Sequence, residues 1–445
     1  MVKKPEPAPV PGRPTREAIE LLLDREHNQQ VRALFHHANR DYFYWDRFKQ
    51  LVPPGIEPET AWSALKLNRR MGARYVPMTS VDGASFWFSL TDELQRSLMV
   101  IERQAGGWIG TTVHEIGRDA KKTYLMRQLM EEAIASSQIE GAATTRRAAK
   151  EMLRTGREPV TRGERMILNN YSTIGQMRRL SDQPLSPQLL LDLQASLTVG
   201  TLSNPSEVGR FRSDADDEII VDEQTGEVMH VPPPAKMLPE RLEALCTWAN
   251  EDGEEFVHPV LKAAMLHFWL AYLHPFCDGN GRTARAVFYL YALRHGYWLF
   301  EYVSISRVIL KRRGQYARAF LYSETDENDL TYFLTFHVHA IEKALEEFWE
   351  YVERKVQEDR TLETRVGKDG GFNHRQRSLL SRALKDSGAV FTIESHRFSH
   401  NVAYATARSD LLDLASRGYL VQLRRGRSFA FVPAAEIRDR LETEE

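Results

Sequence analysis

The residues best suited to chemistry lie in one loop, from His274 to Arg285, that joins two predicted helices. At its centre, Asp278-Gly279-Asn280-Gly281 can turn backbone N–H groups toward one point, because glycine permits the positive φ angles that such an anion nest needs. The loop opens a helix, whose N-terminus favours an anion. Arg282 and Arg285 lie three residues apart and therefore share one face of that helix. Two guanidinium groups beside a nest indicate a phosphate site.

The same loop also offers an acid and a base. Asp278 can hold a hard cation such as Mg²⁺ against phosphates. His274, at the end of the preceding predicted helix, can take a proton from an incoming hydroxyl near neutral pH. The loop therefore predicts phosphoryl or nucleotidyl transfer. The alternative is a Gly-Asn turn between helices with incidental charges, which the coincidence of base, acid, nest and arginines disfavours.

This stretch resembles the signature of the Fic family, His-x-Phe-x-Asp/Glu-Gly-Asn-Gly-Arg-x-x-Arg, and fits all eight specified positions. The resemblance implies a mainly α-helical Fic-type domain with a β-hairpin flap. It also implies transfer of AMP from ATP to a Tyr, Thr or Ser hydroxyl of a protein, this chain included. His274 would be the base, Asp278 would hold Mg²⁺ or Mn²⁺, and Phe276 would anchor the loop. The intact Gly-Asn-Gly-Arg differs from the loop of phosphorylating Doc-type variants. The ATP-binding positions implied are Asp278, Gly279, Asn280, Gly281, Arg282, Thr283, Arg285 and Tyr316.

A second motif, Ser136-Ser137-Gln138-Ile139-Glu140-Gly141, resembles the inhibitory motif of that family, Ser/Thr-x-x-x-Glu-Gly/Asn. Its specified positions here are Ser136, Glu140 and Gly141. The resemblance implies that Glu140 pairs with Arg285 and competes with the ATP γ-phosphate for that guanidinium. Taken alone, Glu140 fits a solvated helix end better than an inhibitory role; the catalytic signature elsewhere in the chain favours the inhibitory role.

A predicted hairpin precedes the catalytic helix, with strands over 218–222 and 227–231 and a turn at 223–226. It resembles the Fic flap, in which an unpaired strand edge aligns a target segment by main-chain hydrogen bonds. The expected contact positions are Val228, Met229 and His230, although His230 is also compatible with an ordinary exposed position. Ser304-Ile305-Ser306 and Tyr316 resemble the segment that covers the nucleotide base in relatives. Tyr316 is followed by alanine where relatives often have a second tyrosine, and it could equally belong to the core.

Helical patterns dominate the middle of the chain. They extend over 16–40, 91–103, 121–141, 146–154, 162–179, 187–197, 240–249, 259–273, 282–294 and 330–357. We expect a disordered tail (1–15), an aromatic-rich helical extension (16–120), a Fic catalytic domain with its inhibitory helix (121–360), a linker (361–371) and a winged-helix domain (372–436).

The C-terminal domain is basic. From Phe372 to Pro433 there are ten Lys or Arg against four Asp or Glu, a local net charge of +6. Its predicted order, three helices and a basic hairpin, resembles the winged helix-turn-helix modules appended to many Fic proteins. Such a module could place Thr406 and Arg408 in a major groove and Arg424, Arg425 and Arg427 on phosphates. A protein-interaction domain with a solvated basic face is an equal alternative.

The composition is that of a globular protein. The 445 residues are 42% hydrophobic and 27% charged, with a net charge of -2, which excludes collagen, low-complexity disorder and disulfide scaffolds. Two cysteines, no apolar stretch of membrane-spanning length and no secretory leader predict a cytoplasmic protein without a membrane partner.

Two rival functions remain open at this stage. One is a DNA-binding regulator whose Fic domain only senses nucleotide, which the basic tail motivates. The other is removal of AMP, with Glu140 positioning a water molecule. Both a monomer and a homodimer are compatible with the sequence.

Overall fold

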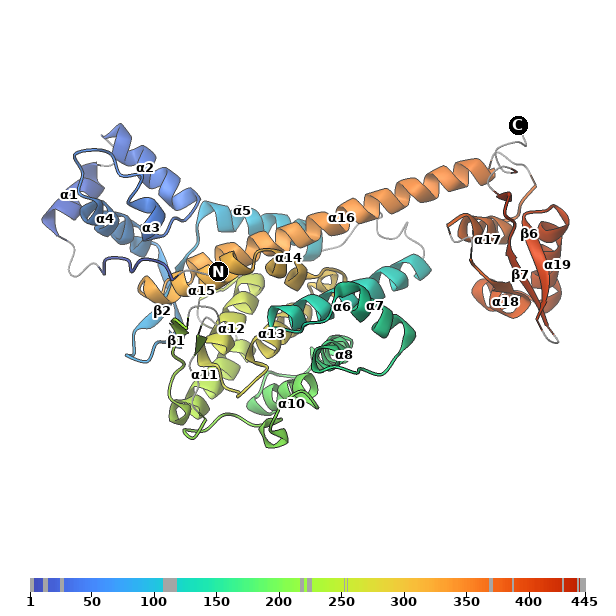
Figure 1. The fold of residues 1–445 in the computed structure, drawn as a ribbon. Helices are drawn as coiled ribbons and strands as arrows, with labels where there is room; N and C mark the ends of the chain where they lie inside the picture. Colours follow the sequence, from blue (N-terminus) through green and yellow to red (C-terminus); the bar gives the residue numbers. More distant parts are fainter. Residues whose placement is uncertain are drawn as a thin grey trace. The chain divides into compact units, whose positions relative to one another are not determined.

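The structure is a computed structural model. It describes residues 4–10, 15–24, 28–106, 118–216, 220–221, 226–251, 253, 255–367, 371–385, 388–425, 428–437 and 440. The chain forms two compact units, of which the first ends at Phe348 and the second contains Trp349 onward. The expected mainly α-helical architecture is confirmed, with three small antiparallel sheets among the described residues (Figure 1).

The first unit opens with short helices around an aromatic core. They are α1 (Arg16–Asp24), α2 (Gln29–Arg40), α3 (Trp45–Phe48) and α4 (Pro58–Met71), followed by the antiparallel strands β1 (Ala73–Thr79) and β2 (Ser85–Ser89). We expected a disordered tail over 1–15, but residues 4–10 pack against this region. Ala8 is buried and its N–H donates to Tyr44 Oη, while the Glu6 carboxylate accepts from Trp45 Nε1. An apolar side chain and a paired carboxylate hold this segment in place.

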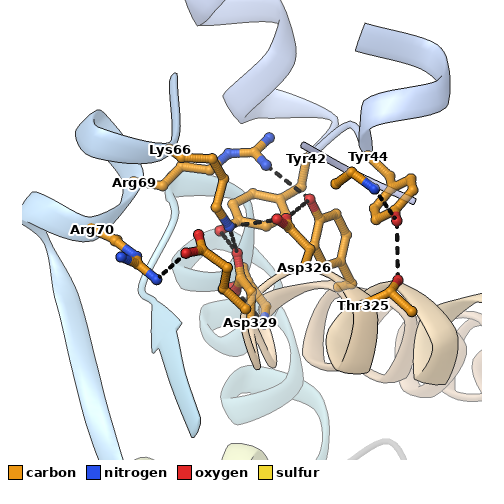
Figure 2. A network of polar contacts seen from close by, with 12 residues as sticks. Tyr42, Tyr44, Lys66, Arg69, Arg70, Thr325, Asp326 and Asp329 are labelled. Carbon is orange, nitrogen blue, oxygen red and sulfur yellow. Dashed lines mark hydrogen bonds and ion pairs between the residues drawn. The ribbon is translucent and has the colours of Figure 1, made fainter. Parts of the chain in front are cut away.

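A buried ionic cluster joins α4 to the turn between α15 and α16 (Figure 2). Lys66 Nζ lies 2.9 Å from Asp326 Oδ2 and 3.4 Å from Asp329 Oδ2. Tyr42 donates to Asp329, and Tyr332 donates to Asp326. The cluster attaches the N-terminal helices to α15 and α16.

The helices that carry the predicted site form the rest of this unit (Figure 1). They are α5 (Asp92–Ile101) with a π-turn at Glu102–Gly106, α6 (Arg118–Ile139), α7 (Arg146–Thr155), α8 (Arg162–Ile174), α9 (Met177–Leu180), α10 (Pro187–Thr198), α11 (Leu238–Asn250), α12 (Pro259–Leu273), α13 (Asn280–Arg294), α14 (Ile305–Lys311), α15 (Arg313–Thr325) and α16 (Thr331–Gly367). Short 3₁₀ turns lie at Pro205–Glu207, Ala235–Met237 and Trp298–Tyr302. α12 is apolar on nearly all faces and is therefore buried.

Two predicted elements differ from the structure for local reasons. The helix expected over 162–179 divides at Gly175, since glycine is a poor helix former. The hairpin is shorter than expected, with β3 at Ile220–Val221 and β4 at Val228–His230. Its strand residues pair antiparallel, Ile220 with His230 and Val221 with Val228. Residues 217–219 and 222–225, which include most of the predicted turn, lie outside the described residues.

The second unit has its own hydrophobic core. It contains α17 (His374–Lys385), β5 (Phe391–Thr392), α18 (Ile393–His400), α19 (Tyr404–Ser416), β6 (Leu420–Arg425) and β7 (Ser428–Pro433), with the antiparallel sheet order β5-β7-β6. The linker expected over 361–371 is helical as far as Gly367, because the preceding stretch lacks proline and glycine and suits a helix. Among the described residues, no helix combines the length and apolarity that crossing a membrane requires.

Candidate active site

The loop between α12 and α13 is shaped by two residues in left-handed backbone geometry. His274 ends α12 with φ 45° and ψ 56°, and its N–H donates to the Leu270 carbonyl. Gly279 precedes α13 with φ 88°. A left-handed residue is a common way to end a helix, but outside glycine it costs about 1 kcal/mol or more. The loop therefore needs other contacts to hold His274 in this geometry.

Side-chain amides supply part of that support. Asn280 Oδ1 accepts from the Phe276 N–H at 2.9 Å, and Asn280 Nδ2 donates to the Phe276 carbonyl at 2.7 Å. Phe276 is fully buried and stacks on Phe211, as expected for an anchor. From α10, Gln194 Nε2 donates to the Asp278 carbonyl, and Gln194 Oε1 accepts from the Gly209 N–H.

Arg212 provides the strongest support and was missed by the sequence analysis. Its Nε donates to the His274 carbonyl at 2.8 Å, and its backbone N–H donates to the Pro275 carbonyl at 2.8 Å. One Nη also donates to the carbonyls of Leu273 and Pro233. A single buried guanidinium thus joins the end of α12 to the proline segment after β4. No spacing or motif that we used points to this residue.

His274 is held in its neutral form. Burial lowers the pKa of His274, and the neighbouring charge of His230 lowers it further, whereas Glu140 raises it; the resulting pKa is about 4. The backbone at Ala271 acts in the opposite direction and raises the pKa. A neutral imidazole keeps one ring nitrogen without a proton, and that nitrogen can accept one.

The carboxylate of Glu140 lies over the predicted anion nest. A Cβ added at Gly281 would lie 2.3 Å from Glu140 Oε1, so only glycine leaves room for it. Arg285 Nη1 donates to Glu140 Oε1 at 3.0 Å. Arg285 also donates through Nε to Ser136 Oγ and through Nη2 to the Ser136 carbonyl, both at 2.9 Å. Ser136 and Glu140 thus occupy this guanidinium, while Gly141 ends the segment with φ 87°.

Arg282 is the second arginine of the predicted phosphate site, and most of its guanidinium bonds to protein groups. Its side chain is buried, with Nη1 donating to the Leu197 carbonyl at 2.8 Å and Nη2 lying 3.3 Å from Asp278 Oδ1. The two arginines bond to different elements, Arg282 to α10 and Arg285 to α6. Within the described part of the chain, Arg282 Nε and Thr283 Oγ1 are buried without a hydrogen-bond partner.

Asp278 is the predicted metal ligand. Its carboxylate pairs with Arg162 Nη2 at 2.9 Å as well as with Arg282, and it remains about one-third exposed. In the described ranges, no group of three or more His, Cys, Asp or Glu could hold a metal ion. A single carboxylate nevertheless fits Mg²⁺, which commonly combines one or two carboxylates with substrate phosphates and water.

The segment expected near the nucleotide base has mixed surroundings. Tyr316 Oη lies 2.9 Å from His267 Nε2, and burial raises the pKa of Tyr316 to about 12. Ser304 and Ser306 are buried and hydrogen-bond the Glu132 carboxylate of α6. They hold α6 rather than presenting free hydroxyls.

The predicted flap residues have different surroundings: Val228 and Met229 are at least partly exposed, whereas the ring of His230 forms hydrogen bonds. Val228 is exposed and Met229 is half-buried, as a docking edge requires. His230 turns inward, with Nδ1 2.6 Å from Glu324 Oε2 and Nε2 2.8 Å from the Tyr272 carbonyl. Glu324 was not anticipated from the sequence.

The expected DNA-contacting residues lie in the second unit. Arg408 on α19 and Arg424 on β6 are exposed, and Thr406 is half-buried. Arg425 belongs to β6, but its side chain and Arg427 lie outside the described residues. Cys246 and Cys277 form no disulfide: Cys246 is buried, and Cys277 is half-buried within the loop.

Residues 184–292 match the family model described as Fic/DOC family. The chain is 28% identical over 146 residues to a protein adenylyltransferase Fic of Nematostella vectensis, covering 33% of this chain and 30% of that protein. It is 31% identical over 117 residues to a protein adenylyltransferase Fic of Drosophila yakuba, covering 26% and 22%. The matches thus span less than a third of these curated relatives. A crystal structure of a Fic family protein from Desulfovibrio desulfuricans G20 shares the fold, with a TM-score of 0.51 and 20% identity over 78% of this chain and 97% of that chain.

Proposed function

We propose that this chain is a protein adenylyltransferase that transfers AMP from ATP to a Tyr, Thr or Ser hydroxyl of a protein, itself included. The observation that carries the proposal is the catalytic loop. A neutral histidine lies there beside an anion nest, and a carboxylate already occupies the nest. The Fic/DOC match over 184–292 and the names of the relatives support the same reaction.

In the proposed reaction, His274 accepts the proton of the target hydroxyl. The hydroxyl oxygen then forms a bond to the α-phosphorus of ATP, and the bond from that phosphorus to the oxygen bridging to the β-phosphate breaks. Pyrophosphate leaves, and AMP remains on the target. Backbone N–H groups at the start of α13 and the guanidinium of Arg285 would bind the phosphates.

Asp278 would hold a divalent cation, Mg²⁺ or Mn²⁺, together with the nucleotide phosphates. When bound, the cation would supply positive charge that offsets the charge of the phosphates. Arg162 and Arg282 already neutralise and orient this carboxylate. Thr283 and the free Nε of Arg282 would complete the ATP-binding set.

Glu140 would act as an inhibitory residue. Its carboxylate takes the Arg285 hydrogen bond that a γ-phosphate needs, and a like charge in the nest repels the nucleotide. Removing Glu140 therefore should free Arg285 for ATP and raise transfer.

The test uses ATP labelled on its α-phosphate, with Mg²⁺, and the full chain as wild type, Glu140→Gly, and Glu140→Gly/His274→Ala. We expect strong self-labelling only in Glu140→Gly. His274→Ala should lower that labelling by about 100- to 10,000-fold. Glu158→Gly, at an exposed non-helical position, is the matched control and should behave as wild type.

ATP labelled on its γ-phosphate should leave no label on any variant, which distinguishes AMP transfer from phosphorylation. Equal labelling of Glu140→Gly and wild type would contradict the inhibitory role. Full labelling of a folded Glu140→Gly/His274→Ala chain would contradict the role of His274.

Removal of AMP is a second candidate. It is favoured by the position of Glu140, which bonds to Arg285 and whose charge raises the pKa of His274. There the carboxylate would orient a water molecule toward the modified side chain. Self-modified protein, prepared with Glu140→Gly, is the substrate for the test. Release of AMP by wild type but not by Glu140→Gln would support it, and equal release by both would contradict it.

We also propose that the second unit is a winged helix-turn-helix that binds DNA through exposed residues of α19 and β6, such as Arg408 and Arg424. The local charge of +6 supports this interpretation. A gel shift with genomic fragments should weaken in Arg408→Ala/Arg424→Ala. If the affinity for DNA were the same in the variant and in wild type, and the same for all fragments, the second unit would instead be a protein-interaction domain.

A further inference from the structure

We propose that Glu324 and His230 form a latch, defined as this residue pair, that positions the flap edge against the catalytic loop for an incoming target. Both are positioning residues, and the inference rests on the proposed transfer reaction. The latch would set how well the target binds, while leaving ATP binding unchanged.

The geometry of His230 carries the inference. His230 is the last residue of β4, and its ring bridges two elements of the first unit. Nδ1 lies 2.6 Å from Glu324 Oε2 of α15, and Nε2 lies 2.8 Å from the Tyr272 carbonyl at the end of α12. The ring also packs on the Tyr272 ring, with centroids 5.1 Å apart. The end of β4 is thereby attached to Tyr272, which lies two residues before His274 in the chain.

Both partners of the ring are acceptors. A carboxylate and a backbone carbonyl accept hydrogen bonds, whereas a neutral imidazole has only one N–H to donate. Both bonds can form only when His230 is protonated. Burial lowers the pKa of His230, but the hydrogen bond and charge of Glu324, aided by the Tyr272 carbonyl, raise it overall.

The charges around His230 come from several elements. Glu324 of α15 favours the protonated ring, whereas Arg212 opposes it. The positive charge of His230 in turn lowers the pKa of His274. Lys4 Nζ donates to the Val228 carbonyl at the other end of β4, 3.2 Å away. Among the charged groups named here, Glu324 is the carboxylate that bonds to the cationic ring of His230.

The latch predicts a pH dependence with a definite sign. A histidine with a raised pKa keeps its bonds below that pKa and loses them as pH rises through it. Target binding should therefore weaken as pH rises above neutrality. The lowered pKa of His274 places its own titration near pH 4, outside this window.

The first measurement is an NMR titration of histidine ring signals in the full chain, with His230→Asn identifying the His230 signal. We expect a midpoint above that of a free histidine, falling in Glu324→Gln because the ring loses the carboxylate that favours its protonated form. Glu93→Gln is the matched control, because it removes another Glu–His pair, Glu93 with His339 at 3.1 Å. A His230 midpoint unaffected by Glu324→Gln would overturn the latch.

The second measurement uses the Glu140→Gly enzyme with the full-length His274→Ala chain as acceptor. Glu324→Gln should raise the KM for the acceptor several-fold at pH 6.5, with the difference shrinking by pH 9, and leave the KM for ATP unchanged. Identical acceptor KM values, or a loss confined to kcat, would overturn the positioning role. Absence of transfer by Glu140→Gly itself would overturn the proposed function and the positioning role together, while the NMR result would still decide whether the pair forms.

Discussion

At the scale of single residues, Gly281 and Glu140 share one small space. The carboxylate fits because Gly281 lacks a Cβ, and Arg285 then holds it by an ion pair of 3.0 Å. Gly281 lies in the first turn of α13 with ordinary helical geometry, so its backbone does not itself require glycine. Glycine is required here because the Glu140 carboxylate occupies the space that a Cβ would fill.

Gly281→Ala should therefore have opposite effects in two backgrounds. In wild type the added methyl displaces Glu140, which we expect to lower the free energy of unfolding by about 1–3 kcal/mol. In Glu140→Gly the clash is gone, and alanine should be neutral or stabilising by up to ~1 kcal/mol. Urea unfolding of the four variants measures this coupling.

Gly175→Ala is the control for that cycle, because its added Cβ would lie 3.4 Å from the Tyr171 carbonyl oxygen and nowhere near Glu140. It should change stability equally in both backgrounds. If Gly281→Ala also changed the free energy of unfolding equally in both backgrounds, Gly281 and Glu140 would not share one space.

His274 also predicts how stability depends on pH. Its pKa falls from 6.5 to about 4 on folding, first through burial and then through the charge of His230. Between these values the unfolded chain binds a proton that the folded chain does not, so stability falls as pH falls. Between pH 7 and pH 4, the free energy of unfolding should therefore fall by up to about 3 kcal/mol less in His274→Asn than in wild type.

Unfolding curves of wild type and His274→Asn across that pH range provide the measurement. A slope that is unchanged in His274→Asn would show that the ring does not titrate in this window.

At the scale of elements, two anchors determine where the motifs lie. Glu132 holds α6 by accepting from Tyr289 Oη at 2.8 Å and from the Ser306 N–H at 3.0 Å. Ser136 and Glu140 follow at intervals of four residues on the same face of the chain. The register of α6 therefore brings Ser136 and Glu140 to Arg285. Arg212 performs the equivalent task for the loop after α12.

Arg212→Lys should impair both folding and transfer, since one amine cannot replace a guanidinium that bonds several carbonyls. We expect the free energy of unfolding to fall by about 2–4 kcal/mol, because buried carbonyls lose their donors. In the Glu140→Gly background, the transfer rate at saturating ATP should fall at least tenfold, or about 1.4 kcal/mol.

Arg210→Lys is the matched control, two residues away. Arg210 pairs with Asp216 at the surface, and such pairs contribute about 0–1 kcal/mol. Similar losses in the two variants would indicate that the segment, and not the Arg212 guanidinium, supports the loop.

At the scale of the whole first unit, the Lys66 cluster connects the N-terminal helices to α15 and α16 (Figure 2). α15 carries Tyr316 and Glu324, which reach toward the site. Lys66 and both of its carboxylate partners are almost fully buried. Breaking such a cluster leaves uncompensated charge in the interior.

Lys66→Met should therefore lower the free energy of unfolding by about 3–5 kcal/mol. Arg70→Met is the control in the same helix: Arg70 is 42% exposed and pairs with Glu327, so its loss should cost under about 1 kcal/mol. Urea unfolding of both variants measures the difference. Equal stabilities would mean that the aromatic core alone holds the N-terminal helices.

The sequence by itself determined the parts of the site that are local. His274, the glycine nest and Arg285 lie within twelve residues, so helix ends and glycine geometry suffice to predict the loop between them. The bounds of α12 follow likewise from its apolar pattern and the proline at its start. The Glu140–Arg285 pair was anticipated only through a family resemblance, and the structure brings the two residues into contact.

Only the tertiary structure decided which distant residues support this loop. Arg212, Gln194 and Glu324 bond to His274, Asp278 and His230, which are 62 to 94 positions away in sequence, and none lies in a recognisable motif. The same holds for Arg282, whose sequence position suggests a phosphate ligand but whose guanidinium bonds to α10. Spacing along one helix defines the direction in which a side chain leaves it, whereas its partner depends on which other element packs on that side.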